Sequence, residues 1–144
     1  MNTKILLTKM LAITGTVLDW LPIIGTIVLS AVSTIGSGIF LFDFLMPAEF
    51  FPLAIGGSLL LLWAGLRAKR LARPISWALD GVIGFFVLSQ AVAILTGLSS
   101  GAVVNGGWQE NLANGLLAGY VLSVIAMGVL GIRLVVSLFE PVKQ

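Results

Sequence analysis

The chain has 144 residues, with eight Lys and Arg, six Asp and Glu, no His and no Cys, and 58% of its residues are hydrophobic. A water-soluble domain of this size cannot bury so much apolar surface, so the composition predicts an integral membrane protein. The cations are too few for a surface that follows phosphates, which excludes nucleic acid as a partner.

The absence of His and Cys excludes disulfides, iron–sulfur clusters, the usual zinc sites and histidine-ligated haem. The glycine-rich stretches match neither a P-loop nor a dinucleotide-binding fingerprint. The acidic residues do not converge as a catalytic triad or a carboxylate dyad would require. We therefore expect no enzymatic activity, no cofactor, no metal and no catalytic residues.

In chain order, the first predicted element is an N-terminal amphipathic helix over Met1–Leu18. Apolar side chains cover most of it, and Lys4 and Lys9 mark the polar remainder, which favours a helix lying in the membrane interface. The alternative is an extension of the first span. We favour the interfacial helix because Gly15 and Asp19 would both weaken a continuous rod.

Four long apolar segments follow, and residues 19–144 are predicted to form one four-span membrane domain. A span takes roughly 17 to 25 residues, and nothing alternates as barrel strands do, so the class is all-α. Asp19 is expected to cap the first span, with Pro22 in its first turn. The spans are Trp20–Phe44, Phe50–Leu66, Ile75–Leu98 and Leu116–Leu138.

The connections differ in chemistry. A tight link precedes the second span, and the longest connection, residues 99–114, is rich in Gly and Asn, which form turns. Between the second and third spans lies a basic loop, which Pro74 follows. Its cations are Arg67, Lys69, Arg70 and Arg73.

Cations beside a span resist translocation, which places the basic loop and both termini in the cytoplasm. Lys4, Lys9 and Lys143 are then inside, and Arg133 lies at the inner boundary. The outer loops carry only Glu49 and Glu110, so all eight cations fall on one side. The predicted location is a plasma membrane of the prokaryotic inner-membrane type.

The two halves of the chain share a weak pattern. Trp20 precedes Val-Leu-Ser-Ala-Val at residues 28–32, and Trp77 precedes Val-Leu-Ser-Gln-Ala-Val at residues 87–92. Two hairpins of the same orientation could descend from one, as a parallel internal repeat. Apolar sequence also produces such matches by coincidence.

Two charged residues lie within predicted spans. Asp80 and Arg133 are each five positions from the inner end of their helix, so an intramembrane ion pair is expected. Its simplest role is a clamp that fixes helix packing. The alternative is a proton or ion site near the cytoplasmic mouth.

A hydroxyl stripe follows the first span, and Gln90 lies near the middle of the third. Such side chains could line a water-filled path, or they could form hydrogen bonds between helices. The candidate path consists of Thr26, Ser30, Ser33, Thr34, Ser37 and Gln90.

Small residues at steps of four or eight predict close helix packing, within the chain or between chains. These are Gly57, Gly65, Gly115, Gly119, Ser123 and Gly131. Four tryptophans near span ends are expected to anchor in the interface. They are Trp20, Trp63, Trp77 and Trp108.

The Pro-Ala-Glu-Phe-Phe-Pro segment at residues 47–52, the apolar run behind it and Arg-Ala-Lys-Arg at residues 67–70 carry a family resemblance. This stretch resembles the equivalent part of the small four-span membrane subunits of tripartite tricarboxylate transporters. The resemblance implies an accessory subunit that partners a larger permease and a periplasmic binding protein. It carries no functional residues over to this chain.

Three functions are compatible with these features. An accessory or assembly subunit of a larger transport or energy-transducing complex is favoured by the small size, the glycine-rich packing faces and the lack of a dedicated site. A self-associating channel or transporter would use the hydroxyl stripe, Gln90 and Asp80. A membrane immunity protein fits the size alone. The expected partners are the lipid bilayer and either other membrane subunits or further copies of the chain.

Overall fold

The structure is a computed structural model that describes residues 3–37, 50–98 and 107–140. These residues form four helices and no strand, and each helix is long and apolar enough to cross a membrane. The predicted all-α class with four membrane-length helices is therefore confirmed. The helices are α1 (Thr3–Ser37), α2 (Phe51–Ala68), α3 (Ala72–Leu95) and α4 (Trp108–Phe139).

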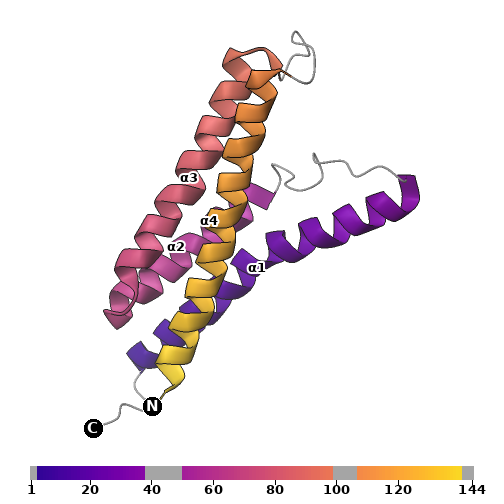
Figure 1. Cartoon of the computed structure of the whole chain (residues 1–144). Helices are drawn as coiled ribbons and strands as arrows, with labels where there is room; N and C mark the ends of the chain where they lie inside the picture. Colours follow the sequence, from indigo (N-terminus) through magenta and orange to yellow (C-terminus); the bar gives the residue numbers. More distant parts are fainter. Residues whose placement is uncertain (1–2, 38–49, 99–106, 141–144) are drawn as a thin grey trace.

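The helices pair as two hairpins, α1 with α2 and α3 with α4, and α1 also contacts α4. Figure 1 shows α3 and α4 side by side along most of their length. In the first hairpin Gly15 faces Leu61 and Gly25 faces Phe50, so the two helices run antiparallel. The descent of the hairpins from a common repeat stays a prediction.

Helix α1 corrects the expected break at Asp19. The helix begins at Thr3 and runs without interruption through Gly15, Asp19 and Pro22. A helix in lipid must keep its backbone groups paired, and neighbouring helices allow it to continue past a proline. Asp19 is therefore not an N-terminal cap. The interfacial position of the first turns stays a prediction, as does the division into two domains.

The C-terminal part of α1 leaves the bundle. From Ile27 to Gly36 every side chain that the structure describes is exposed, up to 87% for Ile35. Figure 1 shows this end of α1 diverging from α3 and α4. The side chains of Ile27, Val32 and Ile35 thus form an exposed apolar surface.

Helix α4 begins at Trp108, eight residues before the predicted start at Leu116, so it takes in part of the expected turn-rich connection. Gly119 of α4 faces the ring of Phe85, which places Trp108 beside the end of α3 at Leu95. The first turns of α4 therefore have a packing partner, and this outweighs the turn preference of Asn111 and Asn114.

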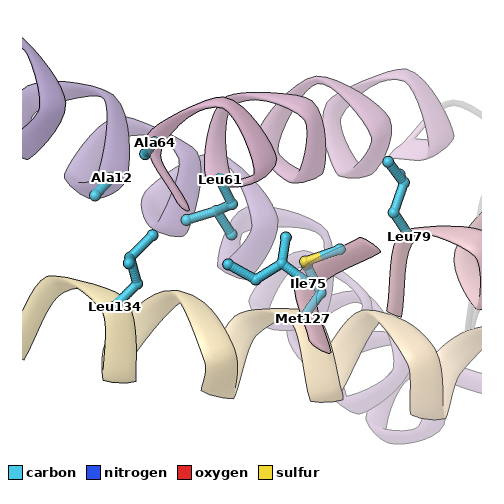
Figure 2. Close-up of a cluster of buried hydrophobic side chains, with 7 residues drawn as sticks. All are labelled: Ala12, Leu61, Ala64, Ile75, Leu79, Met127 and Leu134. Carbon is cyan, nitrogen blue, oxygen red and sulfur yellow. The ribbon is translucent and has the colours of Figure 1, made fainter. Parts of the chain in front are cut away.

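Two apolar clusters fill the bundle. The first joins α1, α2, α3 and α4, and Figure 2 shows Leu134 and Met127 of α4 pointing toward Leu61 of α2. The second contains Ile23, Ala54, Val82, Tyr120 and Val124. Beside it Phe51 stacks on Phe86 with ring centroids 3.6 Å apart, and Tyr120 packs against both rings.

The basic connection forms a tight turn. The N–H of Lys69 donates to Leu66 O and that of Arg70 to Gly65 O, which is the Schellman pattern at a helix end. Lys69 and Leu71 adopt left-handed conformations, with φ of 54° and 55°. The Arg70 guanidinium donates to the carbonyl of Ser137, which ties the turn to the end of α4.

Candidate functional site

The most unusual side chain of the bundle is Asp19, in the middle of α1. It is 0% exposed, and its Oδ1 accepts a hydrogen bond from Ser58 Oγ of α2 at 3.1 Å. A buried carboxyl inside an apolar helix is costly and usually functional or tightly paired. Asp19 therefore marks the first candidate site.

Glycines bring α1 and α2 together at this point. A Cβ on Gly57 would lie 2.8 Å from the backbone N of Asp19 and 2.9 Å from Gly15 O. A Cβ on Gly15 would in turn lie 2.9 Å from Gly57 O. Because neither glycine has a side chain, the two backbones can approach closely, and this brings Ser58 within hydrogen-bond distance of Asp19.

The other carboxylate oxygen faces α4. Asp19 Oδ2 and the indole Nε1 of Trp20 are both buried, and neither has a hydrogen-bond partner among the described residues. They lie 3.4 Å and 2.9 Å from the point that a Cβ on Gly128 would occupy. An acceptor and a donor thus stand near each other without pairing. Together they could hold a species that both donates and accepts a hydrogen bond, such as water.

The site lies between the two apolar clusters. Asp19 is flanked on α1 by Ala12 and Ile23, which belong to different clusters. Ser58 is near the middle of α2, whose 18 residues extend about 27 Å, close to the thickness of a bilayer core. In a membrane that α2 crosses along its length, Asp19 lies close to mid-depth.

The predicted ion pair between Asp80 and Arg133 does not form among the described residues. Both side chains are exposed, and neither has a hydrogen bond or an ion pair there. Gly81 faces Ser123 across the hairpin, so Asp80 is level with Val124, nine residues or about 13 Å from Arg133. The prediction assumed that α3 and α4 end at the same level, whereas α4 continues past the start of α3.

The predicted polar path is only partly described. Thr26 is buried, and its hydroxyl donates to Ile23 O at 2.9 Å within its own helix. Thr34 lies on the diverging part of α1, and Gln90 is exposed on α3. The structure therefore does not bring Thr26 and Gln90 to one path. The side chains of Ser30, Ser33 and Ser37 lie outside the described residues.

Most of the small residues predicted to pack lie at helix contacts or turns. Gly119 meets the ring of Phe85, and Gly131 meets Thr16 Oγ1 and Leu61. Gly65 lies against the turn after α2, and Gly115 has nothing within 4 Å of its Cβ position. Ser123 lies against Gly81 and donates to Gly119 O.

Of the four tryptophans, Trp20 departs from the predicted interfacial role. Its indole N lies buried beside Asp19, whereas Trp77 and Trp108 are exposed near helix ends. Sequence reasoning missed the site because it assigned Asp19 to a helix end and treated Gly15 as a weak point. The signal that could have found it is an Asp between long apolar runs, opposite a Gly-Gly-Ser sequence at residues 56–58.

No group of three His, Cys, Asp or Glu side chains among the described residues could hold a metal ion. Comparisons of the chain with family models, with curated proteins and with solved structures found no match. Of the segment that carries the transporter-subunit resemblance, Pro47, Ala48 and Glu49 lie outside the described residues. The resemblance therefore stays a prediction.

Proposed function

We propose that the chain is a non-enzymatic accessory or assembly subunit of a larger membrane complex, of the transport or energy-transducing kind. The observation that carries this proposal is the outer face of α3. Asp80 and Gln90 are both exposed there, inside an apolar helix of membrane length.

The outer face of α3 is a single stripe. Asp80, Ile83, Val87 and Gln90 follow one another at steps of three and four, and all four are exposed. Asp80 lies eight residues, about 12 Å, into α3, and a charged residue deep in a span costs roughly 2.5 to 3.5 kcal/mol against lipid. A partner helix that donates hydrogen bonds would remove this cost.

A second copy of the chain suits this face less well than a different subunit. In a ring whose axis follows the membrane normal, equivalent residues of all copies have the same depth. Arg133 is about 13 Å from Asp80 along the hairpin, so a neighbouring copy would not place it opposite Asp80. This offset favours another polypeptide as the source of the donors.

The diverging C-terminal part of α1 offers a second contact surface. Its exposed side chains include Ile27, Val32 and Ile35, and none of the three belongs to either apolar cluster of the bundle. A helix end that leaves its own bundle is suited to pack against a neighbouring subunit. Because lipid also covers apolar side chains, this surface supports the proposal without carrying it.

The charge distribution supports a membrane orientation with both termini in the cytoplasm. Lys9 lies 4.1 Å from the ring centroid of Phe139, and Arg70 contacts Ser137, so basic residues of α1 and of the turn after α2 gather at the end of α4. Such an end faces the cytoplasm in plasma membranes, including prokaryotic inner membranes. Cysteine labelling from either side of the membrane at positions 69 and 108 tests this orientation.

Purification in mild detergent tests the subunit proposal. The tagged chain is expected to elute with a second, larger membrane polypeptide in a fixed ratio. The double variant Asp80→Leu/Gln90→Leu should lose that polypeptide, while the exposed control Asn111→Leu on α4 should keep it. Retention of the partner by the double variant, or a homo-oligomer that conducts ions in liposomes, would overturn the proposal.

Autonomous transport is the second candidate, and Asp19 is the observation that favours it. A buried carboxyl near mid-depth with an unpartnered oxygen could take up and release a proton or hold a water in a relay. Purified chain in liposomes loaded with a pH-sensitive dye tests this function. Proton flux that Asp19→Asn abolishes and Asp80→Asn retains would support it, and equal dye traces with and without protein would exclude it.

A further inference from the structure

We propose that the pocket at the basic end of the bundle binds the headgroup of an anionic phospholipid. This pocket measures about 450 Å³ and lies between the first turns of α1, the last turn of α2 and the end of α4. It is lined by Lys4, Ile5, Thr8, Arg67, Ala68 and Leu138.

The lining pairs charge with apolar surface. Lys4 and Arg67 supply two cations from different helices, whereas Ile5, Ala68 and Leu138 supply aliphatic walls. Among the described residues, no carboxylate lines the pocket. A phosphate needs cationic donors, and the glycerol and acyl part of a lipid needs an apolar wall, so this lining matches an amphipathic phosphate ester.

The cations of the pocket differ from the other basic residues at this end. Lys9 lies over the ring of Phe139, and Arg70 donates to Ser137 O, so both are engaged within the chain. The side chains of Lys4 and Arg67 are exposed and have no hydrogen bond or ion pair among the described residues. Two cations directed at a shared pocket can therefore meet one phosphate.

Hydrogen bonds within the chain hold two parts of the pocket rim. Thr8 is buried, and its hydroxyl donates to Lys4 O at 2.9 Å, which holds the first turns of α1. Arg67 is in the last turn of α2, whose end is fixed by the Schellman turn at Lys69. A preformed site loses less entropy on binding than a flexible charged surface does.

The position of the pocket favours a lipid over a soluble phosphate. Arg67, Leu138 and Lys4 each lie within one or two turns of a helix end, which is where headgroups meet helices that cross a bilayer. Leu138 and Ile5 would then contact the start of an acyl chain. A free phosphate would satisfy the cations and leave these apolar walls in water.

Lipid binding to the full chain in a neutral detergent tests the proposal. Native mass spectrometry would measure binding of short-chain phosphatidylglycerol and of phosphatidylcholine to the wild type, Lys4→Gln/Arg67→Gln and Lys69→Gln/Arg73→Gln. The Lys69→Gln/Arg73→Gln variant loses one Lys and one Arg at the same end of the bundle but outside the pocket. Its net charge therefore equals that of Lys4→Gln/Arg67→Gln. A thermal scan of each protein without lipid verifies folding.

At about 1 kcal/mol for each cation, the pocket variant should lose about thirty-fold in affinity for phosphatidylglycerol. The matched control should stay within about three-fold of the wild type, since it keeps both pocket cations. Ala68→Phe, which fills the pocket and keeps every charge, should also abolish binding. This variant keeps the test informative if the charge variants fold poorly.

Three outcomes would overturn the proposal. Equal losses in the pocket variant and the matched control would mean that the basic end attracts lipids as a diffuse surface. Equal affinities of the wild type for phosphatidylcholine and phosphatidylglycerol would show that the pocket does not recognise the negative charge of the headgroup. Displacement of the lipid by millimolar inorganic phosphate, with phosphate alone binding to the wild type, would assign the pocket to a soluble phosphate.

Discussion

The surroundings of Asp19 and Asp80 differ although both residues lie inside apolar helices. Asp19 is buried between α1, α2 and α4, where Ser58 donates to it and glycines leave space for the contact. Asp80 is exposed on α3 and has no partner among the described residues. The register of the neighbouring helices thus decides whether a carboxylate of an apolar helix lies inside the bundle or on its surface.

The largest loss of stability near Asp19 is expected from a side chain at position 57, where glycine is the native residue. Gly57→Leu would place a side chain where even a Cβ lies 2.8 Å from the backbone N of Asp19. We expect a loss of about 3 kcal/mol or more in the free energy of unfolding, because backbone cannot yield as a side chain can. Thermal unfolding in detergent measures this loss.

The neighbouring glycine provides the control. Gly56 has nothing within 4 Å of its Cβ position, so Gly56→Leu should leave stability unchanged or raise it through helix propensity. Equal destabilisation by the two variants would show that α1 and α2 do not meet at Gly57.

Loss of the Ser58 hydroxyl should have the next largest effect. Ser58→Ala leaves Asp19 Oδ1 without the donor that lies 3.1 Å away, and Oδ2 already lacks a partner among the described residues. An unsatisfied buried acceptor costs roughly 1 to 3 kcal/mol, so we expect the free energy of unfolding to fall by about 2 kcal/mol. Denaturant unfolding measures this loss.

A double-mutant cycle sharpens this result. The variant Asp19→Leu/Ser58→Ala replaces both polar groups by apolar ones and should be more stable than Ser58→Ala alone. Additive effects of the two substitutions would mean that the two side chains do not interact.

The comparison also shows what could be predicted from the sequence. Helix type and the approximate spans depend on local composition, and α2 and α3 begin and end within three residues of the predicted bounds. The role of Asp19 and the separation of Asp80 from Arg133 depend on which residues face each other across hairpins. The hydropathy pattern does not show which residues face each other. Glycines such as Gly57 and Gly81 set this register through contacts with residues that are far away in the sequence.

A smaller loss in the free energy of unfolding is expected from a substitution at Gly128, where α4 faces Asp19. Gly128→Ala would place a Cβ 2.9 Å from Trp20 Nε1 and 3.4 Å from Asp19 Oδ2. Because the indole can shift, we expect a loss of only about 1 kcal/mol relative to Gly115→Ala on the same helix. Gly115 has open space at its Cβ position, so that variant isolates the gain in helix propensity. Indistinguishable melting temperatures would place Trp20 and Asp19 away from α4.

The smallest effect on folding is expected at Asp80. Asp80→Leu removes an exposed side chain that forms no hydrogen bond or ion pair within the described bundle, so the free energy of unfolding in detergent should change by less than about 0.5 kcal/mol. The same substitution should remove the partner polypeptide during purification, because the donors opposite Asp80 would face an apolar side chain. Substitution of Asp19 should have the opposite result, because it should lower the free energy of unfolding more than it affects co-purification of a partner. A large loss of stability in Asp80→Leu would mean that Asp80 has an intramolecular partner, and the contrast between the two carboxylates would fail.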